Sequence, residues 1–130
     1  MFIDANIFLE IVLEDQHDQQ CESFFLNCLE KKQQLYTSDF IVYSCLLAIA
    51  HRLHSVEKMK DFLISMHSLH ITVLRPSLKA MKESFQFMEK YKLDFDDALI
   101  IGCMCENDIQ ELVSYDKDFA NVQEITVIRP

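Results

Sequence analysis

The sequence predicts an α/β fold in which a mostly parallel sheet carries helices on both faces. Short, β-branched apolar segments alternate along the chain with longer segments of helical periodicity. A helix between successive strands is the crossover that a parallel pair requires. The chain has 130 residues and is 50% apolar, enough for a sizeable core. No repeat or linker-like segment divides it, so we expect a single domain over residues 1–130.

The first three elements follow from the apolar pattern of residues 1–32. Phe2 and Ile3 open a short strand, and Asp4 ends it. Residues 6–13 are expected to form a helix. Residues 17–32 form an amphipathic helix, because apolar side chains recur there at helical spacing. These side chains are Cys21, Phe24, Phe25, Cys28 and Leu29.

The middle of the chain continues the alternation. Residues 35–37 form the second strand, and Asp39 is placed to cap the helix that follows and runs to about Leu53. That helix is apolar on most sides, so we expect it to be deeply buried. Residues 56–66 form another amphipathic helix with its apolar side chains at helical spacing. They are Val56, Met59, Phe62, Leu63 and Met66.

The second half of the chain supplies two more helices and three more strands. The short, β-branched segment at residues 71–74 is a strand, and Pro76 suits the start of a helix that ends near Tyr91. Asp94 can cap a helix from Phe95 that is apolar all round and therefore central. Residues 112–115 and 126–128 complete the sheet.

Composition excludes several classes of function. The formal net charge of −9 argues against a broad basic surface for nucleic acid. Gly102 is the only glycine, so no glycine-rich phosphate loop can form. Five cysteines without an export signal predict reduced thiols. The longest mostly apolar stretch, residues 40–50, is too short to span a bilayer, so we expect a soluble cytoplasmic protein.

Three aspartates are predicted to meet at one edge of the sheet. Asp4 ends the first strand, Asp116 follows the strand at residues 112–115, and Asp97 lies in the first turn of a buried helix. Sites in parallel sheets gather beyond the carboxyl ends of the strands. Carboxylates are the ligands that Mg²⁺ and Mn²⁺ prefer, and such ions can promote phosphodiester hydrolysis.

Each aspartate also has a purely structural interpretation. Asp4 with Asn6 can cap the helix that follows them. Asp94 and Asp97 have the spacing of a capping box. Asp118, two residues after Asp116, is placed to cap a turn into Phe119. These alternatives stay open when each residue is considered alone.

Four segments, taken together, resemble the PIN-domain family. They are residues 1–9 (MFIDANIFL), 93–100 (LDFDDALI), 112–119 (LVSYDKDF) and 125–128 (ITVI). The resemblance covers the whole chain in the family's order. It implies a PIN-like three-layer α/β/α sandwich with about four to five strands in a mostly parallel central sheet.

The resemblance also implies a function. PIN domains are metal-dependent ribonucleases, and small members are commonly VapC-type toxins restrained by an antitoxin. It places Mg²⁺ or Mn²⁺ on Asp4, Asp97 and Asp116, with Asn6 and Asp118 as supporting groups. The implied partners are an RNA substrate and an antitoxin protein, and no association with a membrane is expected.

One position departs from the family pattern. The family usually has a glutamate where Ser44 lies, and a serine cannot replace a carboxylate ligand. The alternative is therefore a PIN-like binding or regulatory module with weakened or absent catalysis. A phosphatase with Asp4 as nucleophile is a further alternative, although Asn6 then occupies the place of its usual second aspartate.

Two more expectations concern partners. Lys90, Lys92 and Lys117 lie close in sequence to the acids and could contact RNA phosphates. The apolar helices at residues 6–13 and 17–32 could support a homodimer.

Overall fold

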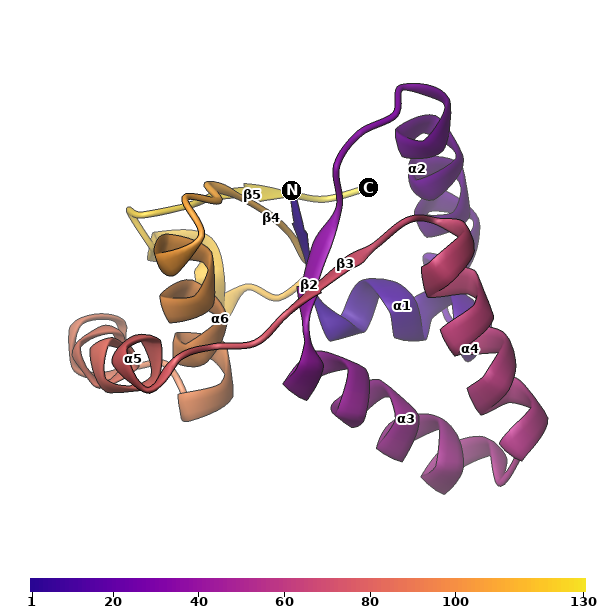
Figure 1. Ribbon diagram of the computed structural model, residues 1–130, viewed down its shortest axis with the longest axis horizontal. Coiled ribbons are helices and arrows are strands. Elements are labelled where there is room, and N and C mark those ends of the chain that lie inside the picture. Colours follow the sequence, from indigo (N-terminus) through magenta and orange to yellow (C-terminus); the bar gives the residue numbers. More distant parts are fainter.

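The computed structural model describes residues 1–130 and contains a sheet of five parallel strands in the order β3-β2-β1-β4-β5 (Figure 1). This arrangement confirms the predicted α/β class. The strands are β1 (Phe2–Ile3), β2 (Tyr36–Ser38), β3 (Thr72–Leu74), β4 (Glu111–Val113) and β5 (Thr126–Ile128).

Six α-helices connect the strands, and each predicted helix is present. They are α1 (Ala5–Val12), α2 (Asp18–Glu30), α3 (Asp39–Leu53), α4 (Val56–Ser68), α5 (Leu78–Tyr91) and α6 (Phe95–Glu106), with the 3₁₀ helix η1 (Asp118–Asn121) before β5. No helix combines the length and apolar character that crossing a bilayer demands.

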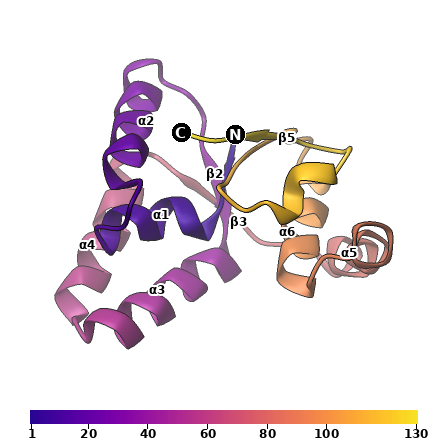
Figure 2. The same ribbon diagram turned by 180° about the vertical axis from the view of Figure 1, so that it is seen from behind.

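The order of the strands explains where the helices lie. From β1 the chain steps outward to β2 and β3, and it then returns past β1 to place β4 on the other side. Because such crossovers are nearly always right-handed, the reversal puts the later helices on the opposite face. Helices α1 to α4 accordingly lie on one side of the sheet, and α5 and α6 on the other (Figures 1 and 2). The strand order reverses between β1 and β4, and sites in such sheets form beyond the carboxyl ends of the strands at this point.

Strand β1 and helix α6 form the centre of the core. Phe2 and Ile3 of β1 are fully buried, and so are Leu112 and Val113 of β4 beside them. Helix α6 lies between the sheet and α5, and its residues from Ala98 to Met104 are all buried. This arrangement confirms the prediction that the last helix is central.

The only glycine lies where α5 and α6 cross. A Cβ atom on Gly102 would lie 2.6 Å from the Ser84 hydroxyl and 2.8 Å from the Ala80 carbonyl oxygen. No real Cβ packs so closely, so the absence of a side chain lets the two helices approach each other.

Helix α3 is less buried than its composition predicts. Tyr43 is 63% exposed and Leu47 is 71% exposed, although Ile41, Cys45 and Ile49 on the other side are buried. The expectation of a deeply buried helix was therefore wrong. The helix carries apolar side chains on all of its faces, but only one of these faces packs against the rest of the protein.

Three helix starts differ in detail from the prediction. Ser38, not Asp39, caps α3 through its hydroxyl group. Pro76 precedes α5 rather than starting it, because Ser77 is the cap. Asp94 lies at the predicted start of α6, but its carboxylate makes no capping hydrogen bond.

Strand β4 ends at Val113, two residues before the predicted end. The Ser114 amide still donates to the Ile128 carbonyl oxygen of β5, and the next two amides donate to side chains. Tyr115 N donates to Asn6 Oδ1 and Asp116 N donates to Ser114 Oγ. Ser114 to Asp116 therefore form a loop that is tied to the start of α1.

Candidate active site

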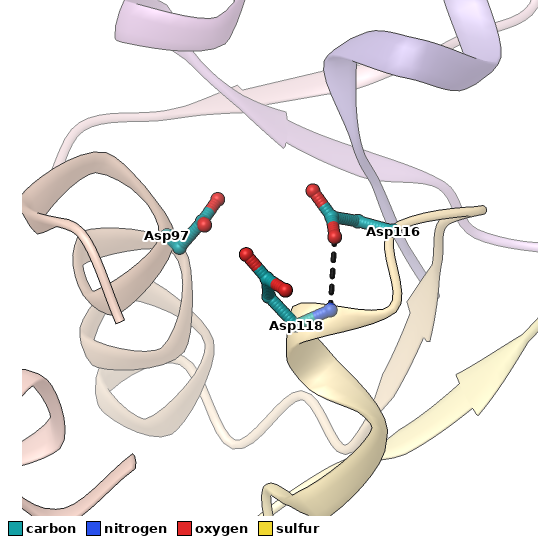
Figure 3. Close-up of side chains that lie close together, drawn as sticks. All are labelled: Asp97, Asp116 and Asp118. Atoms are coloured by element: carbon teal, nitrogen blue, oxygen red, sulfur yellow. Dashed lines mark hydrogen bonds between the residues drawn. The ribbon is translucent and has the colours of Figure 1, made fainter. Parts of the chain in front are cut away.

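Three carboxylates converge beside the carboxyl ends of the central strands. Asp97, Asp116 and Asp118 each offer an oxygen, and these oxygens lie within 4.8 Å of one another. Figure 3 shows Asp97 reaching from α6 toward the two aspartates of the segment after β4. This three-carboxylate cluster joins residues that are about twenty positions apart in the sequence.

Within the turn after β4, the hydrogen bond predicted for the Asp118 side chain is made by Asp116 instead. The Asp118 amide donates a 2.9 Å hydrogen bond to Asp116 Oδ1. This is an Asx turn, in which an aspartate accepts from the backbone two residues on. Asp116 therefore stabilises the turn into η1, whereas the exposed Asp118 carboxylate turns toward Asp97.

Asp4 is buried and fully oriented by its neighbours. Its Oδ1 accepts a 2.6 Å hydrogen bond from the Ala5 amide. Its Oδ2 accepts from Asn6 Nδ2 and from Ser114 Oγ, both at 2.6 Å. Asp4 is also the N-cap of α1, so the structural interpretation of this residue holds as well.

Ser114 joins these groups, although it was not among the predicted site residues. The fully buried hydroxyl donates to Asp4 and accepts from Asn6 Nδ2 and from the Asp116 amide, each at 3.0 Å. A signal for it exists in the strand register. Ile3 pairs with Val113, so the next residue of each strand, Asp4 and Ser114, must lie side by side.

The carboxylates raise one another's proton affinity. Burial is the largest cause that raises the pKa of Asp97 to about 7, and the charges of Asp96, Asp116, Asp4 and Asp118 add to it. Burial also raises the pKa of Asp4, opposed by its hydrogen bonds and reinforced by the Asp116 charge. Asp4 therefore belongs to the same electrostatic group, although its oxygens are not among the three that converge.

The donor set fits a hard divalent cation. All three converging ligands are carboxylate oxygens, with neither a thiol nor an imidazole among them. Such oxygens suit Mg²⁺ or Mn²⁺ better than a softer metal. A cation would also relieve the repulsion that raises the pKa of Asp97.

The sequence from Met1 to Ile125 matches the family model of the PIN domain. The chain belongs to the PIN-domain family. No curated protein matches it significantly.

Solved structures share the fold of this PIN domain at low sequence identity. The VapC20 toxin of Mycobacterium tuberculosis, which cleaves the sarcin-ricin loop, matches with a TM-score of 0.82 and 15% identity over 99% of this chain and 98% of that one. VapBC2 of Rickettsia felis, bound to a promoter DNA fragment, matches with a TM-score of 0.74 and 16% identity over 98% of this chain and 96% of that one. A toxin-antitoxin complex of Klebsiella pneumoniae matches with a TM-score of 0.73 and 17% identity over 96% of this chain and 94% of that one. These matches establish the PIN-like fold.

Ser44 of this PIN domain lies on α3, and its neutral side chain is exposed. The nearby Asp39 does not take its place, because its carboxylate lies 3.9 Å from Arg75 Nε and outside the cluster.

The lysines near the site differ in availability. Lys90 is paired with Glu124 at 2.8 Å, whereas Lys92 and Lys117 are exposed and have no ion pair within 4.0 Å. Of the three predicted phosphate contacts, these two remain available to RNA.

Proposed function

We propose that this PIN domain is a metal-dependent endoribonuclease that hydrolyses RNA phosphodiester bonds. The observation that carries the proposal is the convergence of Asp97, Asp116 and Asp118 beside the ordered Asp4. Family membership supports it, because PIN domains are typically metal-dependent nucleases.

Four aspartates are the proposed ligands of Mg²⁺ or Mn²⁺. Asp97 and Asp116 are proposed ligands, and the geometry adds Asp118, which the sequence placed in a supporting role. Asp4 keeps its proposed place as a ligand. A carboxylate offers about four lone-pair sites, and three are used by its donors, so one is left for the ion. Asn6 and Ser114 orient the Asp4 carboxylate through the hydrogen bonds that they donate to its Oδ2.

The proposed chemistry uses few protein groups besides these acids. Asp97, Asp116 and Asp118, with Asp4, would hold a divalent ion, which would supply polarisation of the phosphodiester, activation of water and stabilisation of the leaving oxygen. The exposed Lys92 and Lys117 attract the phosphate backbone toward an otherwise acidic edge. Asp97, whose pKa is raised to about 7 in the metal-free protein, must lose its proton to act as a ligand, so binding of the ion should strengthen as the pH rises.

RNA cleavage with Mn²⁺ or Mg²⁺ tests the proposal. Wild type should cleave a structured RNA, and the Asp4→Asn and Asp97→Asn variants should lose the activity. Asp61→Asn is the matched control, because this exposed aspartate lies on α4 outside the cluster. Equal activity in all four proteins would overturn the assignment.

We further propose that the protein is the toxin of a toxin-antitoxin pair in the cytoplasm. A cleft of about 460 Å³ between α1, α2 and α4 has Phe8, Ile11 and Phe62 in its wall and the acids Glu22 and Asp61 among its lining residues. Apolar walls with acidic neighbours suit an amphipathic helix that carries basic residues. Binding of a small protein encoded beside this chain, lost in Ile11→Glu, would support an antitoxin at this cleft.

A homodimer is the second proposed partner. Leu26 and Leu29 of α2 are 61% and 44% exposed, as an interface on this helix would require. Sedimentation of wild type and Leu26→Glu tests it, and a monomer at all concentrations contradicts it.

The alternative function is a PIN-like module that binds but cleaves weakly or not at all. Ser44 favours it, because a neutral side chain stands where the resemblance expects a glutamate. Calorimetry with Mn²⁺ separates the two. Binding accompanied by turnover supports the nuclease, whereas the absence of heat supports the weakened module.

A further inference from the structure

A stacked pair of aromatic rings lies beside the acidic segment. The ring of Tyr115, between Ser114 and Asp116, stacks on the ring of His17 with centroids 4.5 Å apart and planes inclined by 26°. His17 immediately precedes α2, so the contact joins the turn between α1 and α2 to the loop after β4.

Both residues are fixed at further points. The Tyr115 amide donates to Asn6 Oδ1 at 3.2 Å, and its hydroxyl donates to the Pro130 carbonyl oxygen at 3.1 Å. The His17 amide donates to Glu10 Oε2 of α1 at 2.6 Å. Tyr115 is thus held by α1, by the turn before α2 and by the segment after β5.

The adjoining acids need such an anchor. Asp116 and Asp118 lie close to Asp97, and like charges at this range repel one another. Residues 114–118 form a loop that is held by hydrogen bonds to Ile128, Asn6 and Pro130 and by those that Ser114 and Asp116 accept, besides the Tyr115 stack. The contacts of Tyr115 therefore provide part of the support that opposes this repulsion.

We propose that His17 and Tyr115 are positioning residues that hold residues 114–118 in place, so that Asp116 and Asp118 face Asp97. The part of this inference that concerns cation affinity rests on the proposed function. The part that concerns the order of the loop stands on the contacts alone. Groups that orient metal ligands typically change metal affinity by about 10–100-fold when they are replaced.

The pair is suited to substitution because neither ring is part of the fully buried core. Both side chains are half-buried, so leucine retains bulk while it removes the stack. Tyr115→Phe keeps the ring and removes only the hydroxyl. Tyr43→Leu is the matched control, since that tyrosine is exposed on α3.

Two measurements on His17→Leu, Tyr115→Leu and the double variant test the proposal. The first is hydrogen exchange of the Asp116 and Asp118 amides in metal-free protein, which should become faster in all three. The second is Mn²⁺ affinity by calorimetry, which should fall by about tenfold in each single variant. The double variant should lose no more than either single one, because both changes break the same contact. Tyr115→Phe should stay closer to wild type than Tyr115→Leu.

The outcomes separate the two proposals. Suppose that wild type binds Mn²⁺ and Asp116→Asn does not. If the leucine variants then show the amide exchange rates and the Mn²⁺ affinity of wild type, the positioning role is wrong. If wild type binds no Mn²⁺, the proposed function fails, and amide exchange alone decides whether the pair holds the loop. If Tyr43→Leu changes amide exchange and Mn²⁺ affinity as much as the variants of the pair do, the cause is a general loss of stability, and the positioning role is wrong.

Discussion

The Ser114 hydroxyl donates a 2.6 Å hydrogen bond to Asp4 Oδ2, and this bond joins the carboxyl ends of β1 and β4. The two residues are 110 positions apart in the chain. The strand register brings them together, because Ile3 pairs with Val113 immediately before them. The same hydroxyl accepts from the Asp116 amide, so one buried group orders acids on both strands.

Replacing Ser114 with alanine should destabilise the protein and weaken its cation site. The change leaves the Asp116 amide without its acceptor and removes one of three donors from a buried carboxylate. An unsatisfied buried partner costs about 1–3 kcal/mol. Urea denaturation should show this loss. Ser68→Ala on the exposed side of α4 is the control, and an equal midpoint in both variants would contradict the prediction.

The sequence was sufficient to predict the order of elements, because each amphipathic stripe lies within a single segment. It also predicted Asp4 and Asp116 near each other, since acids that directly follow parallel strands gather at one edge, and Asp97 from its position in the first turn of α6. Ser114 could not be recognised in the same way. Its role depends on the register of two strands that are distant in sequence, and no local pattern reports that register.

Local patterns also led to two wrong predictions, because tertiary packing decides both features. The spacing of Asp116 and Asp118 allows either residue to support the turn, and the backbone path makes Asp116 the acceptor. The apolar composition of α3 suggested full burial, but no element covers Tyr43 and Leu47. Periodicity counts apolar residues and does not reveal which faces of a helix will find a neighbour.

Gly102→Ala should lower stability even though alanine favours helices. The added methyl would lie 2.6 Å from Ser84 Oγ and 2.8 Å from the Ala80 carbonyl oxygen. Overpacking of this kind costs about 1–3 kcal/mol and outweighs a gain of at most about 1 kcal/mol in helix propensity.

Thermal unfolding of Gly102→Ala and of the double variant Gly102→Ala, Ser84→Ala measures this effect. Removing the hydroxyl should recover only part of the loss, because the backbone oxygen of Ala80 cannot move away easily. Full recovery would place the conflict on Ser84 alone, and an unchanged midpoint in the single variant would contradict the prediction.

The stability of the metal-free protein should depend on Asp97 between about pH 4 and pH 7. The folded-state pKa of Asp97 is raised from 3.8 to about 7, so the folded protein holds this proton more tightly than the unfolded chain. The resulting stabilisation is present at low pH and is lost as the pH rises through the folded value. Asp97→Asn is neutral throughout and should lack this contribution.

Denaturation of wild type and Asp97→Asn at pH 5 and pH 8 provides the measurement. Wild type should lose stability relative to the variant as the pH rises, and Mn²⁺ should restore more at pH 8 than at pH 5 because protons compete with the ion. Asp61→Asn serves as the control, since this exposed residue lies outside the cluster. A constant difference between wild type and Asp97→Asn would contradict the raised pKa.

Ser44→Glu should strengthen cation binding if the missing family glutamate accounts for a weakened site. The position is exposed on α3, so a longer, charged side chain fits without repacking of the core. One added carboxylate ligand should raise Mn²⁺ affinity by roughly tenfold, because ligand charge tunes affinity for hard ions. Leu47→Glu adds the same charge about one turn further along the same helix, where that side chain is 71% exposed. Calorimetry of the two variants separates a new ligand from a general increase in negative charge. An equal gain in both would show that charge alone is responsible, and no gain in either would show that Asp97, Asp116 and Asp118, with Asp4, already form the complete site.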